Sequence, residues 1–385
     1  MTALYVSDAG PVAEHSPAEI RGYAPPMHLL RLAGAPGVGK STTAWAVANR
    51  LAGAGVATGY VDIDQLGMCY PAPDDDPDRW ALKERALAGV ARQFALAGID
   101  RLVVSGVAWP DDPPPQIPGI TVQSLWLDAT EQTRRRRLTM RGDTGEQLLQ
   151  FLSAGTAEAG RVNSAWGRIA TDGLSEADAV EKVLEFGQPA DPNAESDAVQ
   201  PHTGPAAPAT DRMLWITGPR LAGASRIGWE IVSREWTEGR RAGFIDLAQL
   251  SFAWNVDSTL VGLANLARLQ RAFREVGTDR FVVVAPFDVE PAAVRAALPA
   301  SDLSFVRLAP SASDIRRHAR LRRSGDGPSL AGDDVADATE SELEQILLAA
   351  DSQSTLPERE GELSVDTRDL PLQAAAEAVK RAAGW

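Results

Sequence analysis

Short apolar runs alternate with longer amphipathic segments along the first half of the chain. The runs are rich in Leu, Val and Ile, which is typical of strands that are buried on both faces. The segments between them carry apolar residues at helical spacing. Strands that alternate with helices predict an α/β fold, in which a parallel sheet is covered by helices on both faces. The pattern predicts strands at 29–33, 59–63, 102–105 and 122–127, and helices at 40–52, 77–97 and 130–141.

The second half of the chain repeats the first. Residues 29–34 (LLRLAG) match 213–218 (MLWITG), and 59–66 (GYVDIDQL) match 243–250 (GFIDLAQL), both at an offset of 184 residues. Further matches follow in the same order around the next apolar run and the arginine-rich segment after it. Ordered matches of this kind predict a tandem repeat of two homologous units.

The segment between the repeats has the composition of a linker. Residues 188–210 are rich in Pro, Ala and Asp and show no helical or strand period, which predicts a flexible tether. The first 26 residues are small and polar and lack a basic start followed by an apolar run, so they predict a disordered tail rather than a secretory signal. The predicted organisation is a tail at 1–26, an intact unit at 27–187, a linker at 188–211 and a degenerate unit at 212–385.

A phosphate-binding loop follows the first predicted strand. Residues 34–41 read GAPGVGKS, which fits G-x-x-x-x-G-K-[ST] at every position. Glycines let the backbone N–H groups turn toward phosphate oxygens, and the next helix presents its positive end to the same anion. We expect Lys40 to reach the β- and γ-phosphates and Ser41 to bind magnesium, so ATP and Mg²⁺ are the predicted cofactors. The predicted nucleotide-binding residues are Gly34, Ala35, Pro36, Gly37, Val38, Gly39, Lys40, Ser41 and Thr42.

The second unit carries a degenerate form of this loop. Residues 218–225 read GPRLAGAS, with Ala224 in place of the lysine and Leu221 in place of a loop glycine. Loss of the lysine removes the main phosphate charge, and leucine disfavours a positive φ. We therefore expect a pseudo-domain that does not turn over nucleotide, unless Arg220 or Arg226 supplies a replacement cation.

Two acids follow the second predicted strand. Alternation along an extended strand would put Asp62 and Asp64 on the same side, where strand ends face the ligand crevice of an open α/β sheet. One carboxylate would hold magnesium and the other would accept the proton of a hydroxyl that attacks the γ-phosphate. The alternative is a pair of solvated acids that cap the strand end. The second unit keeps Asp246 but has Ala248 at the second position.

An arginine-rich segment follows the fourth predicted strand. Arg134, Arg137 and Arg141 have the spacing i, i+3, i+7 and would share one helix face, which in an otherwise acidic protein suits the phosphates of ATP. The alternative is a solvated basic helix paired with acids. A similar cluster, Arg316, Arg317 and Arg320, persists in the second unit, which weakens the catalytic interpretation or implies that the second unit still holds an anion. The predicted catalytic residues are Lys40, Asp62, Asp64, Arg137 and Arg141, and the predicted metal ligands are Ser41 and Asp62.

Together these motifs resemble the P-loop small-molecule kinases, the group of shikimate kinase, gluconate kinase and chloramphenicol phosphotransferase. The resemblance rests on the P-loop, the Asp-x-Asp-Gln sequence at 62–65, the lack of an acid after the third strand and the arginine-rich segment. It covers about 29–186 and, in weakened form, the chain from 213 onward. It implies that Asp62 helps to place magnesium and that Asp64 contacts the acceptor as the base. It also implies that the arginine-rich segment belongs to a lid that closes over the phosphates. Residues 66–97 carry no acceptor signature of the shikimate or gluconate type.

The composition narrows the class of partner. The net charge of −14 argues against nucleic acid or an anionic membrane as a bulk partner, and no apolar stretch is long enough to span a bilayer. The single cysteine, Cys69, excludes an intramolecular disulfide and fits a cytoplasmic location.

Three functions are compatible with these features. The leading prediction is a kinase that transfers the ATP γ-phosphate to a small hydroxylated acceptor. The alternative is a regulatory module in which ATP changes the relative position of the two units and a protein partner responds. A nucleoside or nucleotide kinase is the third. The acceptor, a protein partner, a homodimer and the packing of the two units against each other are left open.

Overall fold

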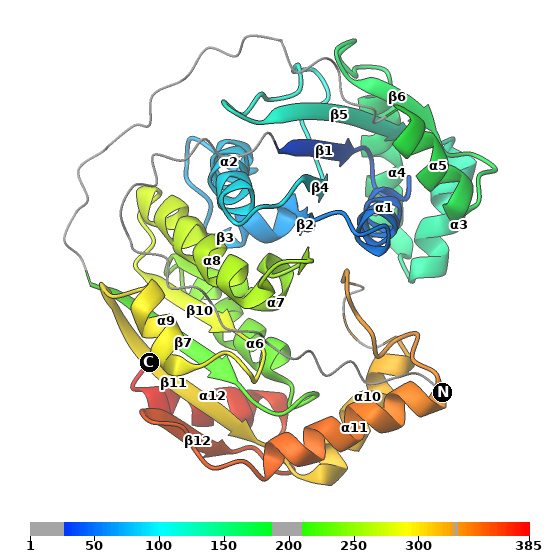
Figure 1. Cartoon of the computed structure of the whole chain (residues 1–385). Helices are drawn as coiled ribbons and strands as arrows, with labels where there is room; N and C mark the ends of the chain where they lie inside the picture. Colours follow the sequence, from blue (N-terminus) through cyan, green and yellow to red (C-terminus); the bar gives the residue numbers. More distant parts are fainter. Residues whose placement is uncertain (1–26, 187–209, 326, 328–329) are drawn as a thin grey trace.

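A computed structural model of the chain describes residues 27–186, 210–325, 327 and 330–385. The predicted tail and residues 188–209 of the predicted linker lie outside the described residues. Two six-stranded, mostly parallel sheets with helices on both sides make up the described part, which confirms the predicted α/β class (Figure 1). No helix in this part combines the length and apolar character that a membrane crossing requires.

The first half of the chain builds one sheet around β1. The parallel strands have the order β6-β5-β1-β4-β2, so the P-loop emerges from the middle of the sheet. The elements are β1 (His28–Ala33), α1 (Lys40–Gly53), β2 (Thr58–Asp62), the 3-10 helix η1 (Ile63–Gly67), α2 (Trp80–Leu96), β4 (Arg101–Ser105), β5 (Thr121–Asp128), α3 (Glu131–Arg141), α4 (Gly145–Ala159), β6 (Gly167–Ala170) and α5 (Glu176–Phe186).

The second half builds a sheet with the corresponding order, β12-β11-β7-β10-β8. Strand register corresponds as well, because Leu29 pairs with Leu102 in the first sheet and Met213 pairs with Phe281 in the second. The elements are β7 (Asp211–Thr217), α6 (Ala224–Thr237), β8 (Ala242–Asp246), α7 (Leu247–Leu250), α8 (Ser258–Glu275), β10 (Arg280–Val284), α9 (Pro291–Ala297), β11 (Ser301–Ala309), α10 (Ala312–Arg323), α11 (Glu340–Ser354), β12 (Glu362–Asp366) and α12 (Leu372–Ala383).

Each half supplies the last strand of the other half's sheet. The two-residue strand β9 (Ala253–Trp254) pairs antiparallel with β2, and β3 (Cys69–Tyr70) pairs antiparallel with β8. Flanking backbone bonds extend both pairings: Tyr60 N–H donates to the Phe252 carbonyl at 2.9 Å, and Phe244 N–H donates to the Met68 carbonyl at 2.8 Å. The exchange is therefore reciprocal.

The halves also share a hydrophobic core. Helices α2 and α8 lie side by side between the two sheets (Figure 1). One buried cluster contains Leu87 and Val90 from α2 together with Leu266 and Leu269 from α8. Each such side chain contributes about 1.5–3 kcal/mol when fully buried. Packing of the two halves against each other, which the sequence left open, is thus extensive.

Local differences from the predicted elements have local causes. The second strand ends at Asp62 rather than at 63, because the Asp62 carboxylate caps the following 3-10 turn. Helix α4 was not predicted, since its sequence is rich in Gly, Ala and Ser and its only buried residues are Leu152 and Gly155. Strands of two residues have no period that a sequence could display.

Candidate functional site

The P-loop has the conformation that anion binding requires. Gly37 and Gly39 have φ of 84° and 93°, which favour glycine. Helix α1 starts at Lys40, and no side chain caps it, so its first N–H groups are not taken up by a capping residue. Gly34 allows the loop to approach the sheet closely, because a Cβ there would lie 2.4 Å from the Leu127 carbonyl oxygen.

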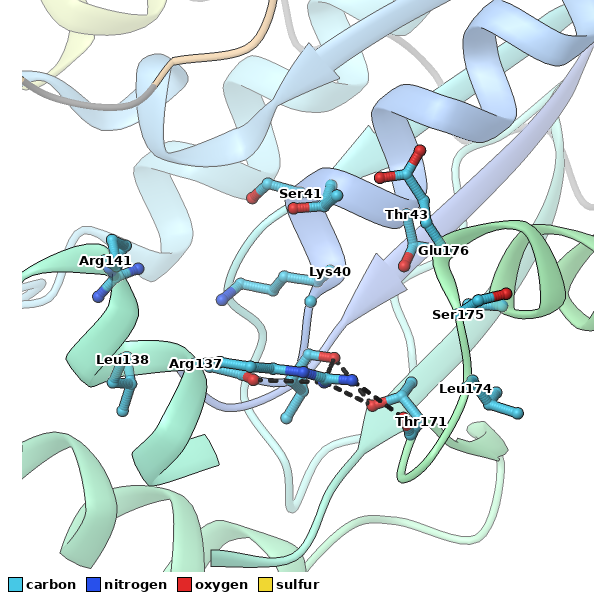
Figure 2. Close-up of a pocket in the computed structure, with 15 residues that line it drawn as sticks. Lys40, Ser41, Thr43, Arg137, Leu138, Arg141, Thr171, Leu174, Ser175 and Glu176 are labelled. Carbon is cyan, nitrogen blue, oxygen red and sulfur yellow. Dashed lines mark hydrogen bonds between the residues drawn. The ribbon is translucent and has the colours of Figure 1, made fainter. Parts of the chain in front are cut away.

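A cavity of about 480 Å³ lies over this loop. Its walls come from the loop and first turn of α1, from α3, and from the segment that leads into α5 (Figure 2). The residues that line it are Gly37, Val38, Gly39, Lys40, Ser41, Thr42, Thr43, Arg137, Leu138, Arg141, Thr171, Leu174, Ser175, Glu176 and Ala179. The predicted Gly34, Ala35 and Pro36 lie in the same loop but not in the cavity wall.

Lys40 extends into the cavity, in the direction of Arg141 (Figure 2). It makes no hydrogen bond or ion pair with any residue that the structure describes. Burial lowers the pKa of Lys40, and the charges of Asp62 and Asp64 oppose that effect. A partly buried ammonium with no hydrogen-bond partner among the described residues is well suited to receive an anionic ligand.

Asp62 lies at the centre of a chain of hydrogen bonds. Its Oδ2 accepts from Ser105 Oγ at 2.9 Å, and Ser105 is 2.9 Å from the Tyr60 hydroxyl. Ser41 Oγ is 3.4 Å from the same Oδ2. Burial, and then the charge of Asp64, raise the pKa of Asp62. Two hard oxygen donors at this separation, beside the phosphate loop, fit Mg²⁺.

Asp64 lies in η1 and not on the strand. Its backbone N–H donates to Asp62 Oδ1 at 2.9 Å, so the predicted placement by strand alternation is wrong, although the two acids remain adjacent. The side chain is 47% exposed and forms an ion pair with Lys83 Nζ at 2.8 Å. Lys83 comes from α2 and is buried.

The three predicted lid arginines do not share a role. Arg137 donates to the Val38 carbonyl at 2.8 Å, to Thr171 Oγ1 at 2.9 Å and to the Thr171 carbonyl at 3.0 Å, so it clamps the P-loop to the segment before α5. Arg141 lines the cavity and pairs with Asp143 at 2.7 Å. Arg134 is buried beneath α4, where it donates to the Leu152 carbonyl, and does not line the cavity.

Several site residues had weak signals in the sequence. Thr171, Leu174, Ser175 and Glu176 line the cavity opposite the P-loop. A Thr-x-x-Leu pattern, present at 171–174 and again at 367–370, marks this segment in both halves. Glu158 carried no signal. Burial raises its pKa, and the charge of Lys40 opposes that shift.

The second half retains the shape of the loop without its chemistry. Leu221 has a φ of 63°, so the leucine does adopt the left-handed conformation, at a cost of about 1–2 kcal/mol. Ser225 Oγ remains 3.2 Å from Asp246 Oδ2. Arg220, one of the two candidate replacement cations, pairs with Asp334 at 2.5 Å. A cavity of about 680 Å³ lies over this loop.

The second half has also lost the P-loop clamp. Helices α3 and α10 are capped by Thr130 and Ser311, and alignment on these caps places His318 at the position of Arg137. His318 Nδ1 lies 2.8 Å from the Leu221 carbonyl oxygen, where Arg137 contacts the first loop. The arginine cluster at 316–320 therefore does not reproduce the clamp.

Comparisons with known proteins assign the chain to no family. No family model matches the chain, and no curated protein matches it. Among solved structures it is similar to a gluconokinase from Sinorhizobium meliloti 1021, with 18% identity over 45% of this chain and 93% of that chain and a TM-score of 0.29. It is also similar to a sugar kinase from Janibacter sp. HTCC2649, with 22% identity over 42% of this chain and 94% of that chain and a TM-score of 0.31.

Proposed function

We propose that the first half of the chain binds Mg·ATP and transfers the γ-phosphate to a hydroxyl group of a small acceptor. One arrangement carries the proposal: Lys40, which forms no hydrogen bond or ion pair with a described residue, the Ser41–Asp62 oxygen pair at 3.4 Å and the half-exposed carboxylate of Asp64 lie together beside the P-loop. Phosphoryl transfer depends mainly on positioning and on compensation of charge, and this arrangement supplies both.

Each residue has a role in this proposal. The loop amides and Lys40 bind the phosphates, and Ser41 and Asp62 would hold Mg²⁺, which neutralises the charge that develops on the transferred group. Asp64 orients the acceptor hydroxyl and takes its proton. Arg141, on the cavity wall, adds positive charge near the phosphates. The resemblance to P-loop small-molecule kinases implies the same division of roles.

The second half acts as a structural partner in this proposal. We interpret the common strand order, the common register and the retained loop shape as the product of a tandem duplication with a degenerate second copy. Without the lysine, the second acid and the clamp, the second loop lacks the means to bind and activate a triphosphate.

A second candidate is a regulatory module whose second half responds to nucleotide. One observation favours it. Trp45 of α1, five residues after Lys40, packs edge-on against Phe252 with ring centroids 4.8 Å apart. A Cβ at Gly332 would lie 2.6 Å from Phe252 and 3.4 Å from Trp45. Phe252 and Gly332 both belong to the second half and lie against Trp45, so a movement of α1 upon nucleotide binding would reach that half directly.

Calorimetric titration with a non-hydrolysable ATP analogue and Mg²⁺ is the first test. We expect one site per chain in the unaltered protein and loss of that site in Lys40→Ala. Two sites would favour the regulatory module, and no site would refute the proposal. Acceptor screening then follows, with saturable stimulation of ATP consumption expected for a kinase. Asp64→Asn should lower the rate of phosphoryl transfer by about 100-fold or more and leave the affinity for the ATP analogue nearly unchanged.

A further inference from the structure

Lys83 holds Asp64 in a defined orientation. Its Nζ lies 2.8 Å from Asp64 Oδ1, and the exposed fractions of the two side chains are 7% for Lys83 and 47% for Asp64. No hydrogen bond from the described residues reaches Asp64 Oδ2. One carboxylate oxygen is therefore tied to a buried ammonium, while the other faces the solvent. A buried ammonium requires a partner, so this contact restricts the carboxylate to few rotamers.

The path of the lysine depends on Gly67. A Cβ at that position would lie 2.7 Å from Lys83 Cε and 2.8 Å from Lys83 Cγ, so only glycine leaves room for the stem. The ammonium also lies 5.3 Å from the ring centroid of Trp80, which adds a cation–π contact. Lys83 thus reaches Asp64 through the space that the missing side chain of Gly67 leaves free.

The second half has lost all three parts of this unit. Residues 94–101 match 273–280 at an offset of 179, which pairs Lys83 with Gly262. The offset of 184 earlier in the chain pairs Gly67 with Ser251 and Asp64 with Ala248. The two matched positions touch in both halves, because a Cβ at Gly262 would lie 2.0 Å from Ser251 Oγ.

The joint loss of the counterparts of Lys83, Gly67 and Asp64 indicates that these residues do more than pack the helix against the turn. In the first half the Lys83 side chain, on the helix, fills the space beside Gly67. In the second half the Ser251 side chain, on the turn, fills the space beside Gly262. Either solution packs the helix against the turn. Only the first solution delivers a positive charge to the acid at position 64, and the second half has Ala248 at the matching position.

We infer that Lys83 is a positioning residue for Asp64: it binds Oδ1 and so presents Oδ2 to the acceptor hydroxyl. This inference rests on the proposed phosphoryl transfer. Lys83 is too deeply buried to contact the acceptor itself, so its effect on turnover passes through Asp64 alone. The acceptor then needs no anionic group to meet this lysine.

The test uses the full chain and Mg·ATP, with water in the position of the acceptor. We expect Lys83→Met to lower the rate of basal hydrolysis by about 10-fold and to leave the KM for ATP within about twofold. In an Asp64→Asn background, Lys83→Met should cause no further loss, because both substitutions remove the same function. Arg85→Met is the matched control: it removes a charge from the same helix at a side chain that is 48% exposed and faces Glu275.

Three results would overturn the inference: an unchanged rate in Lys83→Met, an additive loss in the double variant, or a raised KM for ATP. Failure of the proposed function is distinct, because the unaltered protein would then not bind the ATP analogue at all. If basal hydrolysis is below detection, the urea unfolding midpoints of the unaltered protein, Lys83→Met, Asp64→Asn and the double variant test the inference instead. Non-additive midpoints would support the Lys83–Asp64 unit, and additive midpoints would refute it.

Discussion

Asp246 is a partly buried acid whose ionisation should destabilise the folded protein. Its carboxylate accepts from Ser225 Oγ at 3.2 Å and from Ala248 N–H at 3.1 Å, but Ala224 stands where the first half has a lysine. Burial raises the pKa of Asp246 from 3.8 to about 6. The folded protein therefore binds this proton more tightly than the unfolded chain does, and stability should fall as the pH rises from about 4 to about 6.

Replacement by the neutral amide should remove this penalty. One pKa unit corresponds to about 1.4 kcal/mol, and residual exposure of the group reduces the effect, so we expect Asp246→Asn to stabilise the protein by about 1–3 kcal/mol at pH 7.5. The gain is complete above the folded pKa of about 6 and should vanish near pH 4, where the native carboxyl is protonated.

Urea unfolding at pH 7.5 and pH 4.5, with a chelator present, measures this difference. Asp366→Asn is the matched control of opposite sign, because its hydrogen bonds with Arg368 lower the pKa of that exposed carboxyl to about 2. We expect no gain from the control at either pH. If Asp246→Asn destabilised the protein more at pH 7.5 than at pH 4.5, the carboxylate would be a favourable ion and the reasoning would be refuted.

Two further predictions concern the support of the P-loop. Gly155→Ala should destabilise the protein by about 1–3 kcal/mol in thermal unfolding, because a Cβ there would lie 2.0 Å from Arg134 Nη1. Gly160→Ala, with no atom within 4 Å of the new Cβ, is its control and should leave the midpoint unchanged. Arg137→Lys keeps the charge but loses the planar fork that clamps the loop, so we expect affinity for the ATP analogue to fall by about 10-fold. Arg136 is exposed, so Arg136→Lys is the control and should bind the ATP analogue normally. Equal affinity in the two variants would show that charge alone suffices.

The sequence predicted those parts of the site that are contiguous. The P-loop could be found because its glycines, its lysine and its serine follow one another, and the helix after it begins at the expected residue, Lys40. Asp62 and Asp64 were predicted to share one face of an extended strand, but their conformation depends on a cap that the Asp62 side chain forms with the next turn. Strand alternation could not reveal that cap.

The remaining parts of the site depend on tertiary contacts. Arg137 has the spacing of a lid residue, yet its guanidinium is occupied by carbonyl groups on two distant segments. Lys83 reaches Asp64 across 19 residues, through space that exists only because position 67 is glycine. The left-handed conformation of Leu221 could not be predicted from its residue type either, because the structure around the second loop holds a leucine in a conformation that its own preference opposes.

The exchange of strands β3 and β9 has a consequence for synthesis of the chain. An uncovered sheet edge, with its unpaired N–H and C=O groups, is a template for aggregation. The edge of β2 receives its cover only when Trp254 has left the ribosome, although β2 itself ends at Asp62. The apolar face of α2 is covered later still, because α8 ends only at Glu275. The first half therefore emerges with an open sheet edge, which is closed only after the first part of the second half has been translated.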